Sequence, residues 1–121
     1  LFGEGYRELL SNAYCFVETS EVGGTHPALL EAMASGACVV VNDTPENLET
    51  IGEAGFGYHG EMGGAGLREV LARLLEDPAL VKEQARSGVE RVRAHYSWAA
   101  VTDAYERLFR ELLHERGRRA R

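Results

Sequence analysis

The chain has 121 residues, 45% of them hydrophobic, which is enough for one domain, or for part of a larger fold, that buries a core. Its formal net charge of −6 argues against attraction of the whole surface to nucleic acid. No apolar run approaches the roughly 18 residues of a membrane span, and no signal peptide is visible.

The first half of the chain alternates short apolar runs with a helical pattern. The runs AYCFV at 13–17 and ACVVV at 37–41 are nearly continuous, which is typical of strands buried on both faces of a parallel sheet. PALLEAMA at 27–34 predicts a helix between them, with Gly36 as its C-cap. Strand, helix and strand in about 30 residues form a βαβ unit with a right-handed crossover.

The segments around this unit predict the rest of the α/β core. A strand end is expected at 1–3 and a helix at 5–13. A turn and short helix are expected at 43–55, where Pro45 suits a first helical position. One more short strand is expected at 56–59, and the glycines of 60–66 predict a loop.

From Leu67 onward the apolar residues follow a helical period. One helix ends at Asp77–Pro78, a second covers 80–95, and Ser97 is the expected N-cap of a third. We expect the cluster Tyr96–Ser97–Trp98 to dock this last helix on the core. Its apolar face consists of Trp98, Val101, Tyr105, Leu108, Phe109 and Leu112.

Cysteines and arginines bear on where the protein works. Cys15 and Cys38 lie in apolar runs, which indicates reduced thiols of a cytosolic protein and not a disulfide framework or a metal site.

The arginines of the last six residues suit either a peripheral contact with an anionic membrane or a frayed, solvated terminus. They are Arg116, Arg118, Arg119 and Arg121. The start at Leu1, inside an expected strand, suggests a fragment.

The loop after the first strand is the first candidate site. In an open α/β sheet, ligands bind beyond the carboxyl ends of the strands. Gly23 and Gly24 allow a close approach to the main chain, and Thr25 or His26 is expected to cap a helix whose free N–H groups suit phosphate. The alternative is a tight strand-to-helix turn without a ligand. Neither a P-loop nor G-x-G-x-x-G is present.

Glu31 is the one carboxylate on this apolar helix. It follows Pro27 by one turn, and helical side chains lean toward the N-terminus, so it can project toward the glycines. A carboxylate there suits the hydroxyl pair of a sugar or ribose. The alternative is a solvent-facing glutamate on a half-buried helix.

A second candidate site follows the second strand, at the same edge of the sheet. Thr44 and Asn47 can present hydroxyl, amide or main-chain donors, while Glu49 can hold the loop through its backbone. The alternative is turn and capping chemistry without a ligand. The four histidines show no zinc spacing, and only His26 lies at a candidate site, where a ligand-contacting or catalytic role is one reading.

The segment GGTHPALLEAMASGACVVVNDTPENLETIGEAG at 23–55 resembles the donor-binding region of the family-four group of retaining glycosyltransferases, which have the GT-B fold. HYSWAAVTDAYERLF at 95–109 resembles the Phe-Ser-Trp segment and closing helix of that group. The variant Val-Gly-Gly-Thr-x-Pro is most similar to a bacterial branch that includes rhamnosyltransferase-like enzymes of surface-polysaccharide assembly. The likeness covers nearly the whole chain.

The resemblance implies roles for individual residues. Glu31 matches the second glutamate of the group's Glu-x7-Glu motif, which contacts the nucleotide ribose. The first glutamate, which contacts the donor sugar, falls at Gly23 and is absent. Either Glu21 reaches in, or main-chain groups from Gly24 to His26 hold the sugar. The implied donor-binding set is Gly23, Gly24, Thr25, His26, Pro27, Glu31, Thr44 and Asn47, with Glu21 and His26 as catalytic candidates.

The resemblance also implies a domain and a reaction. The chain is expected to be a single partial Rossmann-like, nucleotide-sugar-binding domain over 1–121, with an α/β core at 1–66 and helices at 67–121. The acceptor domain is expected to be absent, which would leave the fragment inactive by itself. The implied reaction moves a hexosyl or deoxyhexosyl group from a nucleoside diphosphate, with retention, without metal or cofactor, onto a glycan or lipid-linked acceptor.

Two other functions stay open from the sequence. One is a non-catalytic nucleotide-sugar-binding module, in which the missing glutamate marks lost activity. The other is a flavodoxin-like signalling domain, which is weakened because Asp43 is the one candidate phosphoacceptor at a strand end. For the enzyme, the expected location is the cytoplasm, with peripheral contact at the inner membrane face as an option.

Overall fold

Strand β2 (Cys38–Asn42) is the centre of the fold in the computed structural model, which describes residues 3–119. All five of its residues are buried, as expected for an apolar run covered on both faces. Strands β1 (Cys15–Glu18) and β3 (Phe56–Tyr58) pair with it in parallel, in the order β1–β2–β3. The predicted parallel sheet is therefore confirmed. Of the strand end expected at 1–3, residues 1 and 2 lie outside the described residues.

Alternate residues of β2 face two different hydrophobic clusters. Val39 and Val41 pack with residues of α1 (Glu4–Asn12), α2 (Pro27–Ala34) and α3 (Pro45–Ile51). Cys38 and Val40 pack with residues of α4 (Gly64–Glu76) and α5 (Pro78–His95). Fully burying a valine side chain contributes about 1.5–3 kcal/mol, so this strand anchors both halves of the core.

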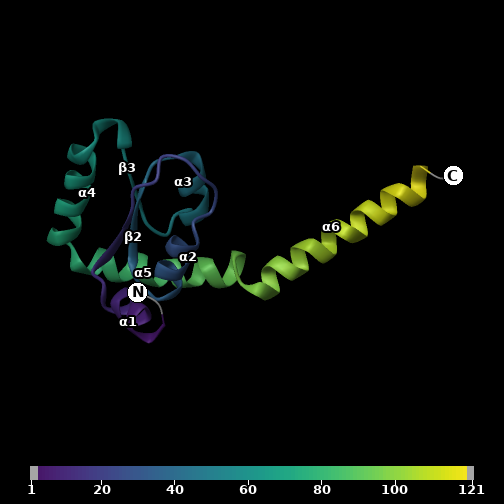
Figure 1. Cartoon of the computed structure of the whole chain (residues 1–121), viewed down its shortest axis with the longest axis horizontal. Helices are drawn as coiled ribbons and strands as arrows, with labels where there is room; N and C mark the ends of the chain where they lie inside the picture. The colour runs from purple at the N-terminus through teal and green to yellow at the C-terminus, as the bar shows by residue number, and fades with distance from the viewer. Residues whose placement is uncertain (1–2, 120–121) are drawn as a thin grey trace.

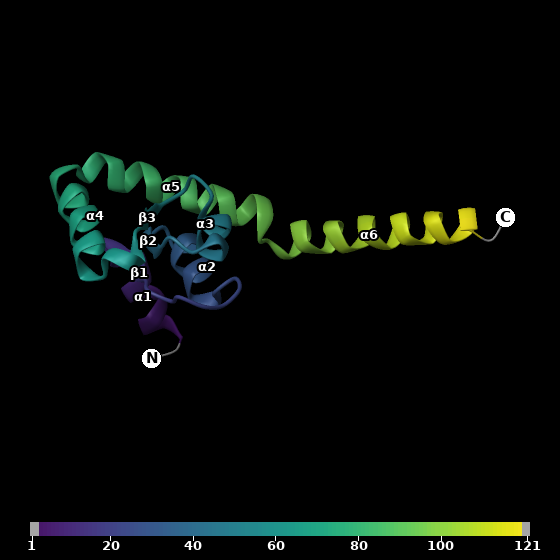
Figure 2. The same cartoon turned by 90° about the horizontal axis from the view of Figure 1, so that it is seen from above.

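Helix α5 crosses the amino edge of the sheet. Its Val89 lies against Gly36, just before β2, and the Nε of its Arg91 donates a 2.7 Å hydrogen bond to the carbonyl of Thr50, in the last turn of α3. Figure 2 shows α5 running along one side of the strands while α1 lies on the other. The carboxyl edge, where the predicted ligand loops emerge, is left uncovered by this helix.

The helix boundaries differ from the sequence prediction at two glycine- or proline-rich points. The expected loop at 60–66 contains a 3-10 turn, η1 (Gly60–Met62), and α4 begins at Gly64 instead of Leu67. Gly66 is buried in α4 so close to the chain that a Cβ there would lie 2.7 Å from the carbonyl oxygen of His59. Helix α5 begins at Pro78 because Asp77 caps it, accepting from the N–H of Leu80 at 3.0 Å.

Helix α6 (Trp98–Arg119) projects away from the sheet, as Figure 1 shows. Ser97 caps it as predicted, its hydroxyl accepting from the N–H of Ala100 at 3.2 Å. The expected docking of Tyr96–Ser97–Trp98 on the core is wrong, because the helix leaves the core at this point and Trp98 is 88% exposed. The rest of the apolar stripe is largely exposed too: Tyr105, Leu108, Phe109 and Leu112.

The arginine-rich end is helical as far as Arg119, which differs from the expected frayed terminus, but Arg116 and Arg118 are exposed, so the expectation of a solvated segment is confirmed for these two. Arg121 lies outside the described residues. Among the helices that the structure describes, none combines the length and the apolar character needed to cross a membrane.

Gly55 tests how tightly the start of β3 packs on β2. A Cβ at this position would lie 2.7 Å from the Cγ2 of Val39 and 2.9 Å from its carbonyl oxygen, which belongs to the backbone and cannot rotate away. We therefore expect Gly55→Ala to lower the free energy of unfolding by about 1–3 kcal/mol in urea denaturation.

Gly64→Ala is the matched control for this substitution. Gly64 begins α4, and nothing lies within 4 Å of a Cβ built on it. The control should change the free energy of unfolding by no more than about 0.5 kcal/mol. Equal stability of the two variants would contradict the close packing of Gly55.

Candidate functional site

The two loops predicted to share one edge of the sheet are joined by a buried network of amides. The side-chain amide of Asn47 donates to the carbonyl of Ser20 at 3.3 Å and to that of Asn42 at 3.1 Å. The amide of Asn42 donates to the same Ser20 carbonyl at 3.4 Å. Asn47 is 1% exposed and Asn42 is 6% exposed. The loop after β1 is thereby fixed to the loop after β2, as their order in the sheet predicted.

Glu18, the last residue of β1, is held by the same loop. Its Oε1 accepts the N–H of Ser20 at 3.0 Å and the hydroxyl of Ser20 as well. Partial burial opposes ionisation of Glu18, but the hydrogen bonds from Ser20 and the nearby His26 outweigh it and lower the pKa of the carboxyl. The sequence analysis missed Glu18, although a carboxylate that ends an apolar strand run is a visible signal.

The two glycines of the loop after β1 differ in backbone conformation. Gly23 has a φ of 145°, whereas Gly24 is not among the described glycines with positive φ, so only Gly23 meets the expectation of an unusual backbone angle. The ring of His26 lies over Gly23, and a Cβ there would be 2.8 Å from its Cε1. His26 is the N-cap residue of α2, but neither its side chain nor that of Thr25 makes the expected capping bond.

Main-chain donors are free along this loop. Within residues 3–119, no protein acceptor takes a hydrogen bond from the N–H groups of 21–26 or of Ala28. The next two N–H groups of α2, from Leu29 and Leu30, bond to the carbonyl of His26. Free N–H groups and the positive end of the helix dipole suit an anion, as the sequence predicted. Anion binding itself stays a prediction.

Glu31 lines a cavity of about 750 Å³ between α1 and α2. Tyr6 and Arg7 of α1 face it from one side, and Pro27 lines it at the first turn of α2, so the cavity reaches from Glu31 toward the glycine loop. Burial and then the carboxylate of Glu31 raise the pKa of the Tyr6 phenol. Glu31 therefore projects from the apolar helix into an open recess, and it is exposed, as the alternative of a solvent-facing glutamate predicted. Tyr6 and Arg7 were not predicted, because nothing in a short helical pattern tells which face meets α2.

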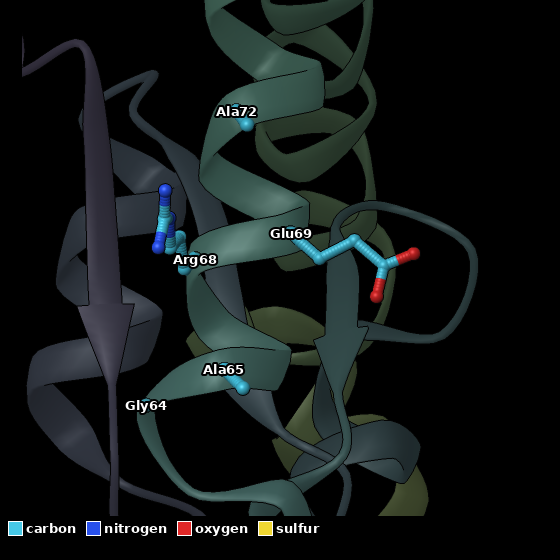
Figure 3. A pocket seen from close by; sticks show the side chains of 5 residues that line it. All are labelled: Gly64, Ala65, Arg68, Glu69 and Ala72. Carbon is cyan, nitrogen blue, oxygen red and sulfur yellow. The ribbon is translucent and has the colours of Figure 1, made fainter.

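Two further surface features bring at most two functional side chains together. A recess of about 480 Å³ lies along α4. Figure 3 shows that Arg68 and Glu69, which line it, point to opposite sides of the helix. Asp43 and His59 join the ends of β2 and β3, with the Nδ1 of His59 2.5 Å from an Asp43 oxygen. This hydrogen bond is the main cause of the lowered pKa of Asp43. Among the described residues, no group of three or more His, Cys, Asp or Glu side chains has the arrangement of a metal site.

Comparison with known proteins decides the family. Residues 1–107 match the family described as glycosyl transferase-like. The chain belongs to this family. It is also similar in structure to a sucrose-phosphate synthase from Thermosynechococcus elongatus, with a TM-score of 0.68 and 26% sequence identity over 82% of this chain. The chain spans 26% of the length of that synthase chain.

These comparisons confirm the predicted fold class and support a transferase class. The glycosyl transferase-like chain has a parallel α/β sheet with flanking helices and a helical C-terminal third, and it matches a fragment of a GT-B glycosyltransferase. Membership of family four and of the rhamnosyltransferase-like branch stays a prediction. So do the roles of the individual site residues.

Two of the predicted donor-binding residues have structural tasks in this glycosyl transferase-like domain. The hydroxyl of Thr44 accepts the N–H of Asn47 at 3.3 Å and caps α3. The Asn47 side chain is buried and its amide is engaged, so we assign it to positioning the loop after β1. The main-chain carbonyl of Glu49 accepts from Arg91 of α5, so that helix holds α3 in place. Direct contact of Thr44 or Asn47 with a donor stays a prediction.

Asn47→Ala should destabilise the domain and loosen the loop after β1. The substitution removes one of two donors from each of the carbonyls of Ser20 and Asn42, which keep the amide of Asn42 and the N–H of Thr44. Two lost hydrogen bonds at about 0.5–1.5 kcal/mol each cost about 1–3 kcal/mol. Urea denaturation should show that loss in the free energy of unfolding. Hydrogen exchange should show faster exchange at Ser20 and its neighbours.

Glu49→Ala, on the exposed side of the same helix, is the matched control. It keeps the main-chain carbonyl that accepts from Arg91, so both the free energy of unfolding and the exchange at Ser20 should stay near those of the unsubstituted chain. Asn47→Ala with the stability and exchange of this control would show that the amide network does not hold the loop.

Proposed function

We propose that this chain is the donor-binding part of a retaining glycosyltransferase of the family-four type, acting in glycan or surface-polysaccharide assembly. One observation carries the proposal: in a glycosyl transferase-like chain, Glu31 lines a cavity that runs toward a loop with free main-chain N–H groups. The sequence resemblance adds the rhamnosyltransferase-like branch, and with it a hexosyl or deoxyhexosyl group as the transferred sugar.

The proposed donor is a nucleoside-diphosphate sugar. Its nucleoside enters the cavity between α1 and α2, where Glu31 accepts hydrogen bonds from the ribose hydroxyls and Arg7 provides a cation at the rim. Its diphosphate lies along the loop at 23–28, where the main-chain N–H groups and the N-terminal end of α2 meet it. Gly24 leaves open space for that approach, since nothing would lie within 4 Å of a Cβ at this position.

In the proposed reaction, the bond between the sugar and the diphosphate breaks and negative charge develops on the diphosphate. Preorganised N–H donors stabilise that charge, and by analogy with oxyanion holes the loss of one donor costs about 10²–10³ in rate. We propose that the reaction needs neither a metal ion nor a further cofactor. Glu21, exposed in the loop, and His26 remain the catalytic candidates from the sequence.

The acceptor is assigned to a part of the enzyme other than these 121 residues, because the chain spans only 26% of the synthase that it resembles. We propose a glycan or lipid-linked acceptor, a cytoplasmic location with peripheral contact at the inner membrane face, and no transfer activity for these residues by themselves. No nucleic-acid partner is proposed, in line with the net charge of −6.

A second candidate function is a nucleotide-sugar-binding module without catalysis. It is favoured by Gly23, which stands where the resemblance places a sugar-contacting glutamate and which the ring of His26 covers. In this case nucleoside diphosphates bind as in the enzyme, but the protein that contains the chain transfers no sugar.

Glu31→Ala tests the proposed ribose contact. Hydrogen bonds to a charged group contribute about 1.5–3 kcal/mol, so the variant should bind a nucleoside diphosphate at least about tenfold more weakly. Isothermal titration calorimetry with UDP, GDP, ADP and dTDP measures the change, and circular dichroism checks the fold.

Glu8→Ala is the matched control for the loss of one carboxylate. Glu8 lies on α1, but outside the set of residues that line the cavity. Its removal should leave the affinity unchanged. Equal affinities of the Glu31→Ala variant and the unsubstituted chain, with the fold intact, would refute the ribose contact.

A further inference from the structure

Glu18 lies on the face of the sheet that α2 covers. In the parallel ladder Glu18 pairs with Val41, and paired residues project to the same face. Val41 belongs to the cluster that contains Leu29 of α2. The carboxylate of Glu18 thus emerges at the carboxyl edge beside the start of α2, where His26 stands. Helix α2 contacts β1, and Figure 2 shows the two elements close to one another.

The carboxylate is held by one oxygen only. Both hydrogen bonds from Ser20 reach Oε1, and no hydrogen bond from the described residues 3–119 reaches Oε2. Ser20 is itself fixed, because the amides of Asn42 and Asn47 both donate to its carbonyl. Glu18 therefore combines a fixed orientation with a free acceptor oxygen, as a binding site for hydroxyl groups requires.

His26, the N-cap residue of α2, lies near this carboxylate. Its ring lies over Gly23, so close that a Cβ at position 23 would be 2.8 Å from Cε1 and 3.1 Å from Nε2. The ring thereby excludes any side chain at Gly23 from this space. Glu21, three residues after Glu18, differs from it because it is exposed and no hydrogen bond of the described residues holds its carboxylate.

We propose that Glu18, oriented by Ser20 and facing the start of α2 beside His26, is the carboxylate that recognises the sugar of the donor. Its Oε2 accepts hydrogen bonds from hydroxyl groups of the transferred sugar. This inference rests on the proposed function, because it places the sugar next to the diphosphate at the loop of residues 23–28. It assigns sugar recognition to the end of β1 and not to the exposed Glu21.

The test separates recognition of the sugar from binding of the nucleotide. Dissociation constants are measured for the full chain with UDP, GDP, ADP and dTDP, and with their glucose, mannose and rhamnose conjugates where these exist. The readout is the ratio of the constant for a conjugate to the constant for its own nucleoside diphosphate. Glu18→Gln should raise this ratio about tenfold or more, because a charged acceptor becomes a neutral amide. The affinity for the nucleoside diphosphate itself should stay the same.

Glu46→Gln, at an exposed carboxylate of α3 outside the proposed site, is the matched control and should change neither the ratio nor the affinity. Glu21→Gln tests the rival carboxylate, and here too the ratio should stay the same. Ser20→Ala should raise the ratio partway, since it removes one of the two bonds that orient Glu18, and Ser20→Thr should restore it. Circular dichroism checks that each variant folds. Ser20→Ala also keeps the test decisive if Glu18→Gln does not fold.

The outcomes distinguish this inference from the proposed function. If nucleoside diphosphates bind and Glu31→Ala weakens them, but Glu18→Gln and Ser20→Ala leave the ratio unchanged, sugar recognition by Glu18 is overturned and the proposed function stands. A raised ratio in Glu21→Gln instead would also overturn it. If no nucleoside diphosphate binds the folded chain, the proposed function fails, and this inference fails with it.

Discussion

The geometry of the carboxyl edge depends on the buried side-chain amide of Asn47. It joins the carbonyl of Ser20, in the loop after β1, to the carbonyl of Asn42, at the end of β2. An amide that bridges two carbonyls away from water allows little displacement, because any movement leaves a polar group without a partner. The place of Ser20, which orients Glu18, follows from this bridge, while the parallel ladder with β2 places Glu18 itself.

Much of the core was predictable because its signals are local. The apolar run of β2 requires cover on both faces, and the helix that follows the glycine loop ends where Gly36 takes a φ of 81°. Asp77 and Pro78 mark the junction of two helices through capping and a missing N–H. Such features depend on neighbours a few residues away, so one sequence suffices to read them.

The remaining features depend on contacts between distant segments. Asn47 looks like a turn residue in the sequence, and only the packing of α3 against the loop after β1 buries its amide. Tyr6 joins Glu31 because α1 packs beside α2. Trp98 suggested docking because its helix has an apolar stripe, but a stripe does not say what covers it, and α6 leaves the core.

Because α5 covers only the amino edge of the sheet, substitutions at the two edges are expected to have different effects. This helix supports the amino edge through its contacts near Gly36, Gly52 and Thr50, whereas the loops with Glu18, Gly23 and His26 lie at the opposite edge. Substitutions at the amino edge therefore affect the whole fold. Exposed positions at the carboxyl edge can vary with little loss of stability, provided that the buried amides stay. One scaffold can thus diversify its recognition of ligands while remaining above the stability that folding demands.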